Sequence, residues 1–253
     1  MQTRSSNAFK LIYWPGIPGR GEYVRLAFEA TGTPYEDTGL ADNAKEVETL
    51  CDPKRQLKDH DAHFAVPVLQ HGNFRVGQTA AILAYVGPII GLAPNDEQGR
   101  AKINQIQLTI SDLTGEAHDT HHPISVSDYY EDQKDEALKR SRDFVDNRMP
   151  KFLDYFERQI AVNGHEPWLY GNTMTYADTS LFQVVDGLLF AFPKCMDGLK
   201  SKHPKVFTLY DAVRSHGKIK EYLASERRQK YSMGIFRHYP ELDIPKSQRK
   251  KSR

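Results

Sequence analysis

The stretch FAVPVLQHGNFRVGQTAAILAYVG, residues 64–87, combines residue types that could bind an anionic ligand. It predicts a strand, a turn, a second strand and then a helix that starts near Gln78 and Thr79. Thr79 could cap the first amides of that helix, which would make the stretch an ordinary hairpin and helix. Alternatively, the backbone beside Pro67 and the positive end of the helix dipole would together bind an anion. These residues alone support the two interpretations equally.

The residues before this stretch predict the rest of a small α/β unit. Residues 9–14 (FKLIYW) favour a short strand with Phe9, Leu11 and Tyr13 on one face. The loop PGIPGRG follows, then a helix over about 22–31 that ends at Gly32, an extended segment from Pro34 and a short helix near 44–50. The glycines form no GxGxxG pattern, which argues against a nucleotide site. Residues 8–88 thus predict a β-α-β half followed by a β-β-α half.

The remainder of the chain has the periodicity of helices. After a linker over 88–97, apolar residues recur every three or four positions over 103–117, 137–160 and 181–192. Pro150 predicts a kink within the second of these helices. Thr175 and Asp178 form a capping box in front of the third. We expect an all-helical domain over 98–239 and a basic, disordered tail over 240–253, so the fold class is α/β plus all-α.

Composition is typical of a soluble globular protein, with 39% hydrophobic and 26% charged residues in a chain of 253. The last eight residues carry five basic groups and no acid, so the formal net charge of +1 leaves −4 for the body. That balance argues against nucleic-acid binding. Two cysteines build neither a disulfide framework nor a zinc cluster. Without an apolar run of membrane-spanning length or a signal peptide, we expect a cytoplasmic protein that does not enter membranes.

Four segments together resemble the cytosolic glutathione transferases. They are YWP at 13–15 with GRGEYVRL at 19–26, AVPVL at 65–69, GQTAAILAY at 77–85 and TYAD at 175–178. Each is common alone, but their order and separations make the resemblance specific, and it covers about residues 9–239. The pattern is most similar to the tyrosine-type classes (sigma, mu, pi and alpha).

The resemblance implies a thioredoxin-like N-terminal domain, a helical C-terminal domain and a two-fold homodimer. It implies that Pro67 is cis and that the backbone of Val66 pairs with the cysteinyl part of glutathione. It also implies that Gln78 and Thr79 hold the γ-glutamyl carboxylate at the helix start, which agrees with the dipole argument.

Other glutathione contacts follow from the same resemblance. Asp112 matches an acid that in several classes reaches the glutathione of the partner subunit. Trp14 is expected among the glutathione contacts, with packing at the domain interface as the alternative. The glycyl carboxylate usually meets a residue after the second strand, where Lys54 and Lys58 are the candidates and a solvated charge cluster is the alternative.

Conjugation requires the thiolate of glutathione, whereas a free thiol with a pKa of about 8.5 is mostly neutral at neutral pH. A hydrogen-bond donor aimed at the sulfur lowers that pKa, and a phenol can donate while keeping its own charge neutral. The resemblance assigns this role to Tyr13 and electrostatic support to Arg20; a packed aromatic and a solvated loop charge are the alternatives. Tyr13 and Gly19 lie six positions apart, one more than the family pattern, which could move the hydroxyl or reshape the electrophile pocket.

His118, His121 and His122 are expected to share a surface of the long helix. Histidines at i and i+4 can bind a metal, but no third ligand is suggested, so no metal site is expected. In the family, helices at this position line the electrophile site. His118 and His121 are therefore candidates for contact with the second substrate, with an ordinary surface role as the alternative.

The sequence therefore predicts a homodimeric glutathione transferase that joins the glutathione thiolate to small hydrophobic electrophiles. Glutathione is the co-substrate, and no further cofactor is expected. The alternatives are a glutathione-dependent isomerase or peroxidase at the same site, and a non-catalytic glutathione-binding protein of the same fold. Tyr13 favours an enzyme, because a binding protein needs no hydrogen-bond donor at that place.

Overall fold

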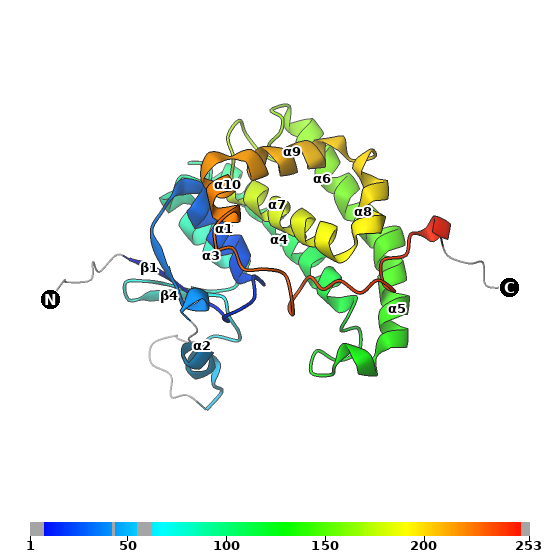
Figure 1. Ribbon diagram of the computed structural model, residues 1–253. Helices are drawn as coiled ribbons and strands as arrows, with labels where there is room; N and C mark the ends of the chain where they lie inside the picture. Colours follow the sequence, from blue (N-terminus) through cyan, green and yellow to red (C-terminus); the bar gives the residue numbers. More distant parts are fainter. Residues whose placement is uncertain (1–7, 42–43, 55–61, 249–253) are drawn as a thin grey trace.

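The computed structural model describes residues 8–41, 44–54 and 62–248. Figure 1 shows the sheet at one end of the molecule and the longer helices at the other, with the two termini at opposite ends.

The N-terminal domain is built on a four-stranded sheet with the order β2-β1-β3-β4. β1 pairs in parallel with β2 and antiparallel with β3, which pairs antiparallel with β4. Along the chain the elements are β1 (Phe9–Ile12), α1 (Gly21–Thr31), β2 (Tyr35–Asp37), η1 (Thr38–Leu40), α2 (Ala44–Cys51), β3 (Val68–His71), β4 (Phe74–Gly77) and α3 (Thr79–Ile89). This β-α-β and β-β-α order is the predicted thioredoxin-like arrangement.

The first strand is shorter than predicted, and this changes the direction of Tyr13. Phe9 and Leu11 pack on one face of the sheet, whereas Ile12 and Tyr13 belong to the apolar cluster on the other face. Strand pairing ends at Ile12, and the backbone N–H of Tyr13 donates to Oγ1 of Thr38 at 3.0 Å. The prediction that Tyr13 shares a face with Phe9 and Leu11 is therefore wrong, because strict alternation does not continue past the end of the strand.

The C-terminal domain is all-helical. Its elements are α4 (Glu97–Asp119), η2 (Tyr130–Asp132), α5 (Lys134–Asp143), η3 (Phe144–Arg148), α6 (Met149–Asn163), α7 (Tyr176–Ala191), α8 (Pro193–Lys200), α9 (Pro204–Ser215), α10 (Gly217–Leu223) and η4 (Lys246–Gln248). The η3 segment is a π-helical turn that joins α5 to α6, so the chain stays helical through Pro150. Among the helices of the described ranges, none is long and apolar enough to cross a bilayer.

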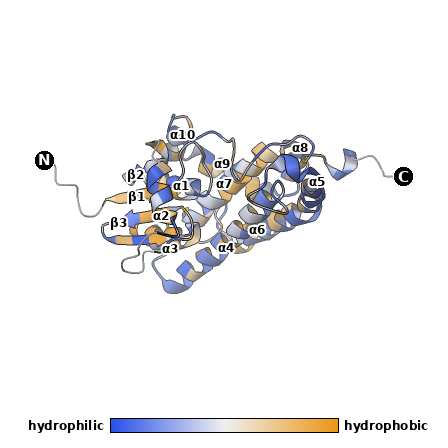
Figure 2. Ribbon diagram, turned by 90° about the horizontal axis from the view of Figure 1, so that it is seen from below, coloured by the Kyte–Doolittle hydropathy of each residue, from blue (hydrophilic) through white to orange (hydrophobic). Residues whose placement is uncertain are grey.

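Helix α7 is the centre of the packing. Figure 2 shows it in the middle of the molecule, between α1 and α8, and it packs against α1, α4 and α9. The predicted capping box opens this helix: the Asp178 carboxylate accepts the backbone N–H of Thr175 at 2.7 Å and that of Leu169 at 2.8 Å. The box is buried, so it fixes the loop before α7 as well as the helix start.

The chain after α10 lies across the molecule, from α10 past α7 to α5 (Figure 1). Near its end Asp243 is fully buried, and its carboxylate accepts the backbone N–H groups of Lys194 (2.9 Å) and Cys195 (3.0 Å) at the start of α8. Leu242 is also buried. The disordered tail expected over 240–253 therefore does not hold for residues 240–244, because Asp243 caps a helix. Residues 249–253 lie outside the described residues.

Candidate active site

The start of α3 presents backbone amides that no side chain of the described residues caps. The N-cap residue is Gln78, and its φ of 69° lies in the left-handed region. Thr79, which the sequence offered as a cap, instead donates its hydroxyl hydrogen to the backbone carbonyl of Arg20 at 3.3 Å. A left-handed φ at a non-glycine residue costs about 1–3 kcal/mol and is found mostly at functional sites. The free amides and the helix dipole favour an anion at this place.

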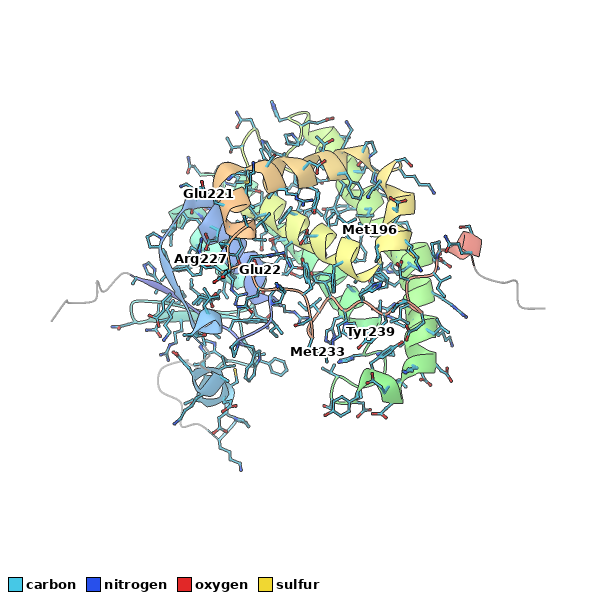
Figure 3. All side chains as sticks on the ribbon, viewed as in Figure 1. Glu22, Met196, Glu221, Arg227, Met233 and Tyr239 are labelled. Carbon is cyan, nitrogen blue, oxygen red and sulfur yellow. The ribbon has the colours of Figure 1, made fainter. Side chains whose placement is uncertain are left out.

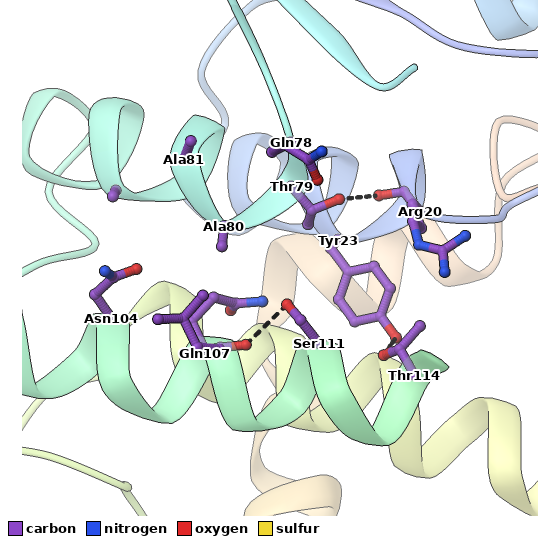
Figure 4. Close-up of a pocket in the computed structure, with 12 residues that line it drawn as sticks. Arg20, Tyr23, Gln78, Thr79, Ala80, Ala81, Asn104, Gln107, Ser111 and Thr114 are labelled. Carbon is purple, nitrogen blue, oxygen red and sulfur yellow. Dashed lines mark hydrogen bonds between the residues drawn. The ribbon is translucent and has the colours of Figure 1, made fainter. Parts of the chain in front are cut away.

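A cleft of about 430 Å³ lies between the start of α3 and helix α4. Figure 4 shows Arg20 and Tyr23 at one end of the cleft and Asn104 at the other. The lining residues are Arg20, Tyr23, Gln78, Thr79, Ala80, Ala81, Ala84, Asn104, Gln107, Leu108, Ser111 and Thr114. Three of the predicted site residues, Arg20, Gln78 and Thr79, are therefore brought together here.

Gln107 lines the same cleft and was missed by the sequence reasoning. It is 1% exposed, and its Oε1 atom has no hydrogen-bond partner among the described residues. An unpaired buried acceptor costs about 1–3 kcal/mol, so a ligand N–H that reaches it would be stabilising. The available signal was a polar residue within the apolar stripe of α4, four positions after Ile103 and three before Ile110.

The Tyr13 side chain contacts the backbone of Arg20. Its hydroxyl oxygen accepts the backbone N–H of Arg20 at 2.8 Å, and the side chain is 6% exposed. Because the Arg20 carbonyl accepts the Thr79 hydroxyl, the backbone of one residue connects Tyr13 to the start of α3. Gly19, with φ 47°, passes over the Tyr13 hydroxyl so closely that a Cβ atom would overlap it. Gly19 therefore encloses the hydroxyl on one side.

The environment of Tyr13 keeps its phenol protonated. Burial raises the pKa of Tyr13 above its ordinary value, and hydrogen bonds from the Arg20 and Gly21 amides, with the charges of Arg20 and Arg25, oppose this only in part. The Arg25 guanidinium lies 5.6 Å from the ring centroid. Since the Arg20 N–H occupies the oxygen as an acceptor, the phenol can offer a ligand its hydrogen.

A buried cluster of charged side chains adjoins Tyr13. Arg25 is fully buried and donates to Asp37 at 2.6 Å, to Glu22 at 3.2 Å and to the Pro18 carbonyl at 3.0 Å. Arg228, in the segment after α10, donates to Glu22 at 2.5 Å. Figure 3 shows Glu22 on α1, close to where α10 meets it. Glu22 and Arg25 lie three positions apart, a spacing at which helical side chains meet, but the sequence alone did not indicate a role for this pair.

Two further predicted contacts adjoin Tyr13. The Val66–Pro67 peptide bond is cis, as predicted, and Val66 is buried in the same apolar cluster as Tyr13. Trp14 follows Tyr13 and is 38% exposed. Neither placement tests the predicted contact with a ligand.

The remaining predicted contacts lie apart from this centre. Asp112 is exposed on α4, next to Ser111 of the cleft lining. Lys54 is exposed in the turn after α2, where its backbone N–H donates to the Asp52 carboxylate at 2.8 Å. Lys58 lies outside the described residues. The residue that meets the glycyl carboxylate stays a prediction.

The three histidines form a cluster at the end of α4. Because α4 ends at Asp119, His121 and His122 lie in the turn that follows and do not share a helix surface with His118. This turn brings all three rings together, whereas the sequence analysis saw no third ligand beside a histidine pair. His121 is 1% exposed, and its Nε2–H donates to the Ile235 carbonyl at 2.9 Å. Contact of His121 with a second substrate would require the segment around Ile235 to move. His118 is only half-buried, so its contact would not require this movement.

Known proteins resemble the chain in sequence along most of its length. The family model described as "Glutathione S-transferase, C-terminal domain" matches residues 118–226. The glutathione S-transferase of Plasmodium yoelii yoelii is 22% identical over 226 residues, which cover 89% of this chain and 98% of that protein. Glutathione S-transferase Mu 2 of Rattus norvegicus is 26% identical over 225 residues, which cover 86% and 91%.

Solved structures show the same fold. The pi-class glutathione S-transferase of Onchocerca volvulus has a TM-score of 0.64 at 21% identity and covers 85% of this chain and 92% of that one. Prostaglandin synthase D of Nilaparvata lugens has a TM-score of 0.66 at 20% identity and covers 87% and 98%. The chain therefore resembles glutathione S-transferases in sequence along most of its length and shares their fold, including the sheet order and the free start of α3 described above.

Proposed function

We propose that this chain is a tyrosine-type glutathione S-transferase that binds glutathione at the start of α3 and joins its thiolate to small hydrophobic electrophiles. The observation that carries the proposal is the buried, protonated phenol of Tyr13, which the backbone of Arg20 connects to Thr79 at the cleft. The related transferases support the reaction type.

The γ-glutamyl end of glutathione has a carboxylate and an ammonium group, and the cleft offers a partner for each. The free amides at the start of α3, with Gln78 and Thr79, suit the carboxylate. The unpaired Oε1 of Gln107 suits the ammonium, which has hydrogens to donate. Arg20 adds positive charge at the end of the cleft near Tyr13, where a thiolate would form.

Tyr13 would stabilise the thiolate by donating its phenol hydrogen to the sulfur. The thiol proton passes to solvent, and the sulfur lone pair then forms a carbon–sulfur bond with the electrophile as a leaving group departs with its electrons. A hydrogen bond to the anion lowers the thiol pKa from its free value of about 8.5. The raised pKa of Tyr13 keeps the phenol in the donor form throughout.

We further propose a cytoplasmic homodimer with a detoxifying role, in which the exposed Asp112 of α4 reaches the glutathione of the partner subunit. The family relationship supports the dimer. Light scattering on the full chain tests it, and a monomer mass at assay concentration would contradict both the dimer and the role of Asp112.

The test of the main proposal compares wild type, Tyr13→Phe and Tyr129→Phe with a chromogenic aryl halide and glutathione. Tyr129 is 74% exposed, so its variant is a matched control. Tyr13→Phe should lower kcat/KM roughly 10- to 100-fold, because one hydrogen bond to a charged group is lost. The pH midpoint of kcat/KM should rise in Tyr13→Phe alone. Equal rates and profiles in the three proteins would contradict the role of Tyr13.

The same assay separates the alternatives. No turnover together with retention on immobilised glutathione would indicate a non-catalytic binding protein. Turnover of a hydroperoxide or an isomerisable substrate, without the aryl halide, would indicate a peroxidase or isomerase at the same site.

A further inference from the structure

The histidine cluster of His118, His121 and His122 has the dimensions of a metal site. The ring centroids are 5.0, 5.0 and 4.7 Å apart. Three imidazoles that bind one tetrahedral ion have centroids about 5 Å apart, because each metal–nitrogen bond is about 2.0–2.1 Å long. One nitrogen from each ring lies within 4.8 Å of the others. Ligand nitrogens around a tetrahedral ion are about 3.4 Å apart, so a shift of no more than about 1.5 Å completes the site.

Hydrogen bonding already orients His121 as a ligand. Its Nε2–H donates to the Ile235 carbonyl, so in the neutral ring Nδ1 carries the lone pair. This Nδ1 lies 3.3 Å from Nδ1 of His122, close to the separation of two ligands on one tetrahedral ion. Metal-bound histidines usually donate their other ring N–H to a carbonyl or carboxylate, as His121 does.

His122 requires a change of tautomer and a turn of its ring. Its Nδ1 lies 2.6 Å from the backbone carbonyl of His121, so without an ion this nitrogen carries the hydrogen. Moving that hydrogen to Nε2 frees the Nδ1 lone pair without a change in net charge. A turn of the ring then directs this lone pair away from the His121 carbonyl, which would otherwise repel it.

The rings of His118 and His121 are uncharged at neutral pH, as metal ligands must be. Burial lowers the pKa of His118 to about 4 and that of His121 to about 3. The charged groups that act on them are cationic: Arg237 on both rings and Arg20 on His118. These charges weaken the binding of any cation and favour an anion, such as hydroxide, as its fourth ligand.

We infer that His118, His121 and His122 bind one divalent transition-metal ion of the zinc type and leave its fourth position open. Three imidazole ligands suit zinc and cobalt better than magnesium or calcium, which prefer oxygen. An ion would bind here whether or not Tyr13 activates a thiol, because the cluster is made by the end of α4 and the turn after it.

The experiment titrates the full chain, prepared without a polyhistidine tag, first with Co²⁺ and then with Zn²⁺. We expect one ion per chain, the intense visible absorption of tetrahedral cobalt, and its loss when zinc displaces cobalt. His118→Ala is the main variant because His118 is half-buried, and the exposed His165 provides the control His165→Ala. His118→Ala should bind at least about 10-fold more weakly, since even removal of a group that only orients a ligand costs that much, and His165→Ala should bind as wild type does.

A second readout guards against a variant that fails to fold. Zinc should raise the thermal unfolding midpoint of wild type and His165→Ala but not that of a folded His118→Ala or His122→Gln, because a ligand stabilises only the state that binds it. Weak octahedral cobalt absorption, several ions per chain, or equal affinity in wild type and His118→Ala would overturn the inference.

Discussion

The two polar regions on either side of Tyr13 are built in opposite ways. The cleft at Gln78 and Thr79 combines backbone amides at the start of α3 with side chains of α4, and Gln78 is exposed. The cluster next to Tyr13 is made of charged side chains from widely separated segments, including Arg25 and Arg228. This cluster is largely buried.

The difference separates binding from stability. Among the described residues, the amides at the start of α3 have no side-chain cap and Oε1 of Gln107 has no partner, so a ligand can bind these groups. The buried charges are already paired with one another, so they hold α1 against the segment after α10. Substitutions in the cleft should therefore change activity more than stability, and substitutions in the charged cluster should do the reverse.

The largest effect should come from Arg25→Ala, which tests the stability side of the comparison. It leaves Glu22 and Asp37 as buried charges with one partner fewer, which should lower the free energy of unfolding by about 3–5 kcal/mol. Urea unfolding measures this. The exposed Arg158→Ala is the control and should change stability by less than about 1 kcal/mol. Similar small losses in both variants would remove the distinction between the two regions.

Gly19→Ala tests the activity side of the comparison. A methyl group at Gly19 would overlap the Tyr13 hydroxyl, so kcat/KM should fall roughly 100-fold, as misplaced catalytic groups do. Gly16→Ala is a matched control, because Gly16 also has positive φ (76°) but nothing within 4 Å of its added Cβ atom. Gly16→Ala should lose roughly 1–2 kcal/mol of stability from backbone strain, and Gly19→Ala should lose more because of the overlap. Equal activity in the two variants would show that the enclosure of Tyr13 does not matter.

The pH dependence of stability tests the buried, uncharged histidines, which contrast with the buried charge pairs. The folded pKa values of His118 (about 4) and His121 (about 3) lie below the unfolded value near 6.5. The unfolded chain therefore binds more protons between these values, and each ring should lower stability by about 1.4 kcal/mol per pH unit as pH falls from about 6.5 to 4. Unfolding midpoints across this range measure the slope, which His118→Asn should reduce. A flat wild-type profile would contradict the neutral cluster.

The smallest effect should come from Gln107→Leu. Loss of the acceptor should raise KM for glutathione a few-fold, because one hydrogen bond contributes about 0.5–1.5 kcal/mol. Stability should stay equal or increase, because an unpaired buried oxygen is removed. Gln105→Leu, at an exposed position of the same helix, should leave KM unchanged. An unchanged KM in Gln107→Leu would remove this residue from the binding proposal.

Local patterns predicted the parts of the molecule that depend on neighbouring residues. The hairpin and helix over 64–87, the helix end at Gly32 and the capping box at Thr175 are all present. Each depends on a few adjacent positions, so residue types and spacing suffice to predict it.

The remaining features depend on contacts between distant segments. Arg228 meets Glu22 across 206 positions, and His121 meets Ile235 across 114. No local spacing encodes these contacts. The direction of Tyr13 was mispredicted for a related reason: β1 stops pairing at Ile12, and the Tyr13 N–H instead donates to Thr38 of another segment.

The two backbone hydrogen bonds of Arg20 determine which changes in this loop the enzyme can tolerate. Its N–H meets Tyr13 and its C=O meets Thr79, so any side chain at position 20 except that of proline preserves both bonds. The loop closes tightly from Gly19 onward, whereas Gly16 is exposed and unconstrained by neighbours. A residue added around Gly16 would therefore leave the two Arg20 bonds to the phenol and to Thr79 in place.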